Sequence, residues 1–135
     1  MENDATEIAV PPLHGEIPPD VQTVVDLTCE FSEVRSVREG RRYISIPTMD
    51  GSVPPNLVTF RESVHETANL ETPIYVHCAY GHGRAALMAA SILIRRGVAS
   101  SAEEAYALLK KARPGVRPNR LQRSWLQRVT SQLSP

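Results

Sequence analysis

The sequence predicts a single α/β domain with a small, mainly parallel sheet flanked by helices. Segments typical of strands alternate with segments typical of helices over the first two thirds of the chain, and helices alone finish it. The most apolar strand leads through a short glycine-bearing loop into the most apolar helix. A chain of 135 residues, of which 41% are hydrophobic, is long enough for one hydrophobic core.

Two strands are expected in the first third of the chain. Residues 1–20 hold four of the eleven prolines and show little hydrophobic periodicity, so we expect an extended lead-in to a domain over residues 21–135. Residues 21–28 are compact and rich in β-branched side chains, which favours a buried strand of the parallel type. Residues 42–46 alternate in polarity and end at Pro47, which predicts a second strand that terminates there.

A helix, a strand and a second helix follow. Apolar side chains recur at spacings of three and four over residues 57–68, which predicts an amphipathic helix with two prolines at or just before its first turn. Residues 74–78 form a short apolar strand. Residues 85–96 favour a helix, and Gly97 is expected to stop it.

Two further helices are expected at the end of the chain. Ser101 and Glu104 have the spacing of a capping box, and the helix that they begin ends before Pro114. The last helix follows Asn119. Its apolar stripe is expected to hold Leu121, Trp125 and Val129.

Composition excludes several classes of partner. The 15 basic and 15 acidic residues balance, whereas affinity for a phosphate backbone needs a net basic face, so nucleic acid is not an expected partner. The longest apolar run, residues 85–94, is about half of the ~20 residues that span a bilayer, so no transmembrane helix is expected. The acidic start lacks the positive region of a signal peptide. We therefore expect a cytoplasmic protein, and we expect it to be a monomer.

Cysteine and histidine usage argues against a disulfide scaffold and against a metal site. Cys29 and Cys78 are the only cysteines, and the four histidines show no ligand spacing, so neither a metal nor another cofactor is expected. Both thiols are expected to be reduced. Cys29 is interpreted as a structural thiol, and the alternative is a resolving partner that protects Cys78 under oxidation.

The residues that indicate chemistry lie between the most apolar strand and the helix after it. Cys78 ends that strand, where open α/β sheets bind ligands. Gly81 and Gly83 allow successive N–H groups to turn inward around an anion, and the helix that starts near Arg84 adds the positive end of its dipole. These surroundings favour the thiolate, so Cys78 is expected to be a nucleophile. The planar guanidinium of Arg84 can donate hydrogen bonds to two phosphoryl oxygens at once.

This arrangement resembles the cysteine-dependent protein tyrosine phosphatase superfamily, in its small dual-specificity branch. The family signature is a His-Cys pair, five further residues, and an arginine followed by Ser or Thr. His77, Cys78 and Arg84 match it, with glycines inside the loop. Pro47 with Asp50 resembles the family's general-acid loop. The resemblance extends from about residue 21 to residue 128 and implies a dual-specificity-phosphatase-like fold.

The resemblance implies a cysteine-based protein phosphatase with a two-step reaction. Cys78 attacks phosphorus and forms a phosphocysteine while Asp50 protonates the leaving oxygen, and Asp50 then takes a proton from the water that releases phosphate. Arg84 binds phosphate together with the loop amides of Ala79, Tyr80, Gly81, His82 and Gly83.

The residues give weaker, independent support for Asp50. A leaving alkoxide needs a proton donor, and Asp50 lies on a glycine-bearing loop after a strand. Of the other aspartates, Asp4 and Asp20 lie in the lead-in and Asp26 lies inside a strand. The alternative for Asp50 is a turn-forming role in its Asp-Gly pair.

Three positions near the nucleophile have supporting or uncertain roles. By resemblance His77 orients Cys78 or its loop, although a core histidine explains it nearly as well. His82 is expected to shape the pocket rim and is not interpreted as a base. Ala85 departs from the family, which has a hydroxyl there that stabilises the leaving thiolate, so slower breakdown of the phosphoenzyme is expected. The short start is a second departure, because there is little room before Val21 for the family's opening strands.

The substrate is left open between classes. The chain has only seven aromatic residues and no length for the ring-stacking loop of tyrosine-specific relatives, so a shallow pocket for phosphotyrosine and phosphoserine or phosphothreonine is expected. A phosphoinositide or phosphatidylglycerol phosphate is the alternative substrate, or the protein is a weakly active, phosphate-binding pseudophosphatase. Sulfur transfer of the rhodanese type is a further alternative. The lipid alternative rests on a basic cluster that is also explained as solvated surface: Arg35, Arg38, Arg41 and Arg42.

Overall fold

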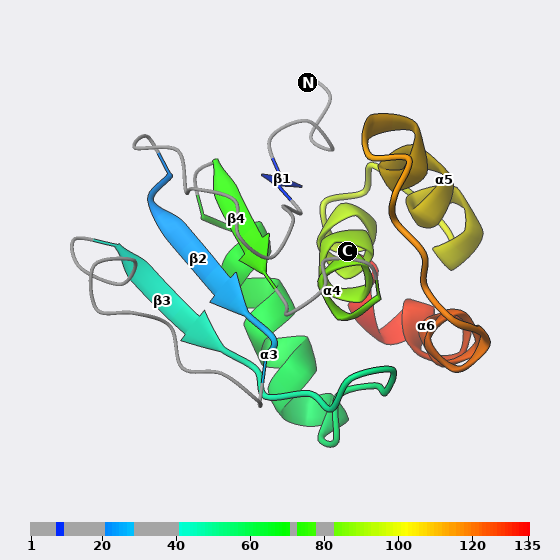
Figure 1. Cartoon of the computed structure of the whole chain (residues 1–135), viewed down its shortest axis with the longest axis horizontal. Coiled ribbons are helices and arrows are strands. Elements are labelled where there is room, and N and C mark those ends of the chain that lie inside the picture. The colour runs from blue at the N-terminus through cyan, green and yellow to red at the C-terminus, as the bar shows by residue number, and fades with distance from the viewer. Residues whose placement is uncertain (1–7, 10–20, 29–40, 71–72, 78–82) are drawn as a thin grey trace.

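The computed structural model describes residues 8–9, 21–28, 41–70, 73–77 and 83–135 (Figure 1). Within them, four parallel strands form one sheet in the order β1-β4-β2-β3. The strands are β1 (Ile8–Ala9), β2 (Thr23–Asp26), β3 (Arg42–Ser45) and β4 (Ile74–His77). The predicted α/β class with a small parallel sheet is confirmed.

Strand β1 was not expected. Ile8 pairs with Ile74 and Ala9 with Tyr75, so the segment interpreted as a lead-in adds an edge strand to the sheet. The segment before Val21 thus contains a two-residue strand, and the expectation that it has little room for the family's opening strands stays a prediction. A two-residue strand is too short to produce the alternation by which strands are recognised in a sequence. The proposed domain boundary at residue 20 stays a prediction.

The four helices of the described residues are α3 (Leu57–Ala68), α4 (Arg84–Arg95), α5 (Ala102–Ala112) and α6 (Arg120–Leu133). Helix α3 has the predicted bounds, because the Asn56 side chain caps its first turn by accepting a hydrogen bond from the Thr59 N–H. Helix α4 ends before Gly97, whose φ of 76° is the left-handed conformation that glycine adopts without strain.

The capping box lies at a different helix from the one expected. Ser101 caps α5 by accepting from the Glu104 N–H, but the Glu104 carboxylate accepts from the Ser100 N–H at 2.6 Å, not from Ser101. The reciprocal pair is present at the start of α6, between Asn119 and Gln122.

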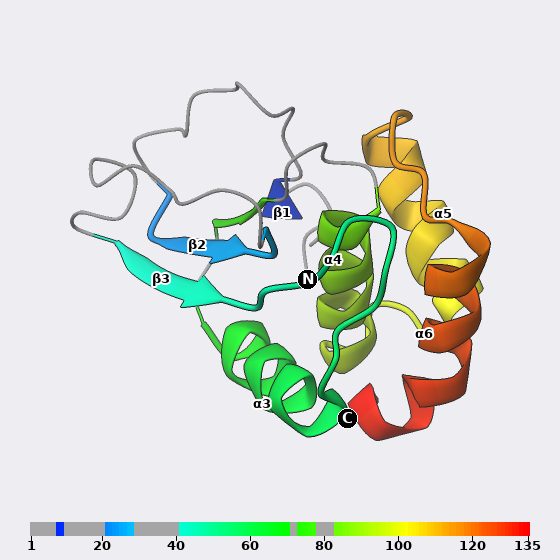
Figure 2. The same cartoon turned by 60° about the horizontal axis from the view of Figure 1, so that its bottom comes forward.

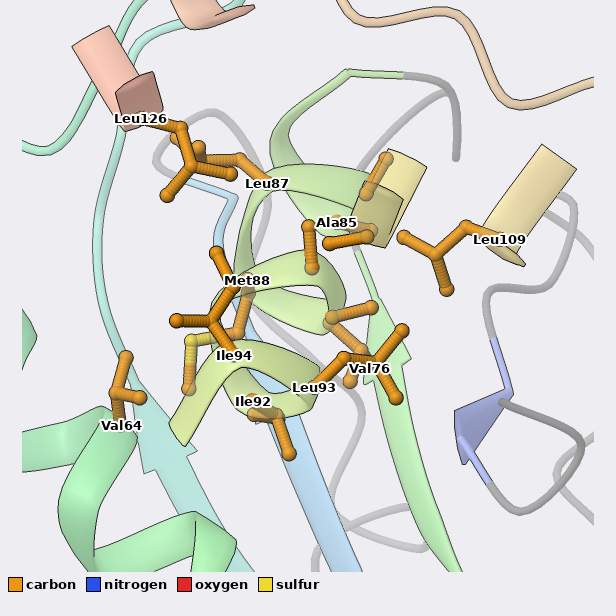
Figure 3. Packing of buried hydrophobic residues seen from close by; sticks show 14 of the residues in the cluster. Val64, Val76, Ala85, Leu87, Met88, Ile92, Leu93, Ile94, Leu109 and Leu126 are labelled. Atoms are coloured by element: carbon orange, nitrogen blue, oxygen red, sulfur yellow. The ribbon is translucent and has the colours of Figure 1, made fainter. Parts of the chain in front are cut away.

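Helix α4 is the centre of the fold. Every residue from Arg84 to Ile94 is buried, as expected for a helix that is covered on all sides. Figure 2 shows α3 and α4 beside the sheet, with α5 and α6 beyond α4. Figure 3 shows side chains of α4 packed among neighbours that come from four elements: Val64 of α3, Val76 of β4, Leu109 of α5 and Leu126 of α6. A smaller cluster contains Val24, Tyr75 and Tyr43.

The apolar stripe of α6 differs in one position from the prediction. Leu121 is 48% exposed, so its expected place in the stripe was wrong. Trp125 is partly buried and its ring meets that of Phe60 edge to face, with centroids 5.4 Å apart. The buried positions are Gln122, Leu126, Val129 and Leu133. A polar glutamine therefore occupies the inward position of the first turn.

The buried hydroxyl of Tyr106 in α5 leads to a prediction about stability. Its hydroxyl is buried with no hydrogen-bond partner among the described residues, and burial raises the pKa of this phenol. Because an unsatisfied buried hydroxyl costs free energy, Tyr106→Phe is expected to raise the free energy of unfolding by about 1 kcal/mol in urea titrations at neutral pH.

The pH dependence of Tyr106 has a defined sign. Above the unfolded pKa of about 10 the unfolded chain loses the phenolic proton first, so the free energy of unfolding falls as the pH rises. The Tyr106→Phe variant is expected to show a smaller fall. A variant that is less stable than the wild type at neutral pH would show that the hydroxyl has a partner.

Candidate active site

The carboxyl ends of three strands lie side by side at one edge of the sheet. Asp26 at the end of β2 pairs with Ser45 of β3 on one side and with His77 of β4 on the other. The chain continues from His77 into the expected phosphate-binding loop and returns at Gly83, directly before α4. The loop residues themselves lie outside the described residues: Cys78, Ala79, Tyr80, Gly81 and His82.

Arg84 is the first residue of α4, and its side chain is buried at 1% exposure. Its Nη1 donates a hydrogen bond to the Thr48 carbonyl at 2.8 Å. Its Nη2 lies 3.8 Å from Asp50 Oδ1. The expected phosphate-binding arginine and the expected acid, which are far apart in the sequence, are thus brought together at this edge.

Asp50 lies in a tight turn, and its side chain is 66% exposed. The Ser52 N–H donates to the Met49 carbonyl at 2.9 Å, and Gly51 has a φ of 74°. The turn therefore uses the Asp-Gly pair as a turn-former. This structural role does not compete with a chemical one, because the carboxylate itself extends toward solvent and the Arg84 guanidinium.

Both ends of this turn are anchored. At one end, the buried Thr48 donates its N–H to the Leu27 carbonyl at 3.1 Å. At the other end, Asn119 Nδ2 donates to the Gly51 carbonyl at 2.7 Å and Gln122 Nε2 donates to the Ser52 carbonyl at 3.1 Å. The sequence analysis did not identify Asn119 or Gln122 as site residues. Their Asn-x-x-Gln spacing was a detectable signal, but for a helix start only.

The Asp26 carboxylate has a structural role. Its buried carboxylate accepts hydrogen bonds from the Thr28 N–H at 2.8 Å, from the Thr28 hydroxyl at 2.7 Å and from the Tyr43 hydroxyl. These three donors hold the end of β2 to the residues that follow it and to Tyr43 of β3. They explain the carboxylate without a role in proton transfer, which agrees with its exclusion as the acid.

The start of α4 is tightly packed. Ala85 is fully buried, and Gly83 supplies no side-chain cap to the helix. A Cβ on Gly83 would lie 2.6 Å from Gln122 Oε1, so a side chain here would require the buried Gln122 amide to shift. The positive end of the α4 dipole lies at this glycine.

The two described arginines of the basic cluster contact other residues of the same chain. Arg42 pairs with Glu66 of α3 at 2.8 Å, and Arg41 Nε donates to the Val21 carbonyl at 3.1 Å. Arg35 and Arg38 lie outside the described residues, as does Cys29.

Among the described residues, no helix is long and apolar enough to cross a bilayer. Those residues also hold no group of three side chains suited to a metal ion.

Comparison with known proteins agrees with this fold. Residues 16–132 match the family model described as "Dual specificity phosphatase, catalytic domain". The "Putative tyrosine phosphatase 197R" of Invertebrate iridescent virus 6 is 34% identical over 83 residues, which are 54% of this chain and 31% of that protein. The chain thus spans about a third of the length of this relative.

Solved structures share the fold at low sequence identity. Human DUSP28 is 20% identical with a TM-score of 0.67, over 84% of this chain and 79% of that chain. PTPMT1 in complex with PI(5)P is 23% identical with a TM-score of 0.67, over 84% and 78%. Tk-PTP in its active form is 22% identical with a TM-score of 0.67, over 84% and 80%.

The parallel sheet and the His-Cys-x5-Arg segment are typical of cysteine-based protein phosphatases. Within that class, the chain belongs to the dual specificity phosphatase family, since the match to its catalytic domain covers most of the chain.

Proposed function

We propose that this protein hydrolyses phosphomonoesters through a phosphocysteine on Cys78. In the first step a bond forms between the Cys78 sulfur and phosphorus, the ester P–O bond breaks, and Asp50 donates its proton to the leaving oxygen. In the second step Asp50 accepts a proton from a water whose oxygen attacks phosphorus, and the thiolate leaves. Arg84 and the amides of residues 79–84 bind the phosphoryl oxygens throughout.

The observation that carries the proposal is the pairing of Arg84 with Asp50. Asp50 Oδ1 lies 3.8 Å from Arg84 Nη2. An ester oxygen held about 2.8 Å from Nη2 can therefore lie about 3 Å from the Asp50 carboxyl, which is the reach that proton transfer needs. A buried guanidinium at the start of α4 supplies the positive charge that equatorial oxygens require.

The proposed substrate is a phosphorylated protein, and the site is proposed to accept both phosphotyrosine and phosphoserine or phosphothreonine. Arg41 and Arg42 contact Val21 and Glu66 of the same chain, so the described part of the basic cluster gives the lipid alternative no specific support. Phosphate release from phosphotyrosine and phosphothreonine peptides, compared with release from vesicles that contain a phosphoinositide, distinguishes the two. A monomeric, cytoplasmic protein stays a prediction.

Rapid mixing with p-nitrophenyl phosphate tests the mechanism. The wild type is expected to release one equivalent of p-nitrophenol in a burst and then to turn over slowly, because the fully buried Ala85 offers no hydroxyl to the departing thiolate. Acid quenching followed by peptide mass spectrometry is expected to locate the phosphoryl group on Cys78. Ala85→Ser is expected to raise the steady-state rate by about 10-fold without changing the burst.

Two outcomes would contradict the proposal. Vanadate binding without a burst and without labelled Cys78 would identify a phosphate-binding pseudophosphatase. Transfer of sulfur from thiosulfate that survives Asp50→Ala would identify a sulfurtransferase, because that reaction does not require the upstream acid.

A further inference from the structure

We propose that Asn119 and Gln122, at the start of α6, are positioning residues that hold the Asp50 turn over Arg84. This inference rests on the proposed role of Asp50 as proton donor. It assigns a task to the N-terminus of α6 beyond starting a helix: the same two amides that cap α6 also fix the far end of the acid-bearing turn.

Asn119 links the helix to the turn through both ends of its amide. Its Oδ1 accepts from the Gln122 N–H at 2.9 Å, which caps α6. Its Nδ2 donates to the Gly51 carbonyl at 2.7 Å. The capping bond and the turn bond use different atoms, so a substitution can remove one and keep the other.

Gln122 connects the turn to the start of α4. Its side chain is 1% exposed, its Oε1 accepts from the Asn119 N–H at 2.9 Å, and its Nε2 donates to the Ser52 carbonyl at 3.1 Å. It also packs directly on Gly83, which precedes Arg84. Gln122 therefore contacts both segments that carry the proposed acid and the proposed phosphate-binding arginine. A buried amide with bonds to both of its polar atoms holds a unique orientation.

The arrangement of the anchors explains why these contacts matter for proton transfer. The turn around Asp50 is fixed before it by Thr48, which Arg84 and Leu27 hold, and after it by Asn119 and Gln122. The Asp50 side chain is mostly exposed, so its own contacts hold it weakly. Without the second anchor, only the Thr48 end of the turn remains fixed. A displacement of about 1 Å at a reacting group can cost on the order of 10²-fold in rate.

A positioning role predicts a loss that depends on the leaving group. Phosphate binding through Arg84 and the loop does not use the Asn119 amide donor, so the inhibition constant of inorganic phosphate is expected to stay within about twofold in Asn119→Ser. Phenyl phosphate needs a proton on its strongly basic leaving oxygen, whereas p-nitrophenolate leaves with little help. We expect the burst rate constant, which reports the first step, to fall by about 10- to 100-fold for phenyl phosphate and by less than about threefold for p-nitrophenyl phosphate.

The experiment uses Asn119→Ser in the full chain, because serine keeps a capping acceptor but loses the amide donor to Gly51. Urea titration confirms that stability is retained, and Asn119→Ala shows the effect of losing the cap as well. Arg128→Ala on the same helix is the control, since Arg128 is exposed and donates to Ser124 Oγ of the same helix at 3.0 Å, and it is expected to match the wild type.

The same substitution is then made together with Asp50→Asn. If Asn119 acts through Asp50, Asn119→Ser changes the burst rate constant for phenyl phosphate in the wild type but not in the Asp50→Asn background. An unchanged burst rate constant for phenyl phosphate in Asn119→Ser, or an equal loss in both backgrounds, would overturn the inference. A wild type without turnover would instead overturn the proposed function, so the two failures are distinguishable.

Discussion

Cys78→Ser is expected to abolish turnover of phosphate esters, with a loss on the order of 10⁵-fold in kcat. A serine hydroxyl stays protonated near neutral pH in the same surroundings in which a thiol ionises. The thiol has an ordinary pKa of about 8.5, which the N-terminus of a helix and a nearby arginine lower. In this chain the segment after Cys78 leads directly into α4, and Arg84 stands at the first position of that helix.

Binding distinguishes a lost nucleophile from a lost fold. Cys78→Ser is expected to bind inorganic phosphate as the wild type does, because the loop amides and Arg84 remain. Titration calorimetry measures this, and circular dichroism checks the fold. Cys29→Ser is the matched control for cysteine replacement and is expected to retain full turnover. Residual turnover above a few per cent of the wild type in Cys78→Ser would show that another group attacks phosphorus.

Strong local signals made most elements predictable. Helix α3 has the predicted bounds because Asn56, a good capping residue, follows two prolines directly before an amphipathic repeat. Helix α4 was predictable from its continuous apolar and small residues, and Gly97 marks its end. Strand β1 was not, because Ile8 and Ala9 gain their strand conformation from pairing with β4 and carry no pattern of their own.

The inward face of α6 shows a second limit of prediction from the sequence. Leu121 was assigned to the core because it is apolar, but Gln122 takes the buried position beside it. Burial of this glutamine depends on partners that are distant in the sequence, the Ser52 carbonyl and the Gly83 backbone. Hydrophobic periodicity ranks residues by polarity alone, so it cannot detect a polar side chain whose hydrogen bonds are supplied by tertiary structure.

The sequence proposed residues for the candidate site but not the connections between them. The signature proposed Arg84, the resemblance to a general-acid loop and the exclusion of the other aspartates proposed Asp50, and the structure brings these two side chains together. The contact between Arg84 and the Thr48 carbonyl and the two amide contacts from α6 join segments that no local pattern relates. The roles of Cys78 and of residues 79–82 stay predictions, because they lie outside the described residues.

Arg84→Lys is expected to lower kcat/KM by about 10²- to 10³-fold, although it keeps the charge. The guanidinium has two tasks that a single ammonium group cannot perform together. One arm donates to the Thr48 carbonyl at 2.8 Å, while Nη2 lies near Asp50 and the proposed position of substrate. A lysine ammonium presents one point of charge on a flexible stem, so it can bind Thr48 or phosphate but cannot hold two oxygens in the planar geometry of the fork.

The same substitution is expected to lower stability, because Arg84 is buried at 1% exposure and a lysine ammonium does not reproduce the packing and the two-armed contacts of the guanidinium. The expected decrease in the free energy of unfolding is about 1–3 kcal/mol. Arg95→Lys, at the other end of α4, is the matched control: Arg95 donates to the Ser134 carbonyl at 3.1 Å, and its replacement is expected to leave kcat/KM unchanged. Equal kinetics for Arg84→Lys and the wild type would mean that charge alone suffices, and that the fork between Thr48 and Asp50 has no part in binding phosphate.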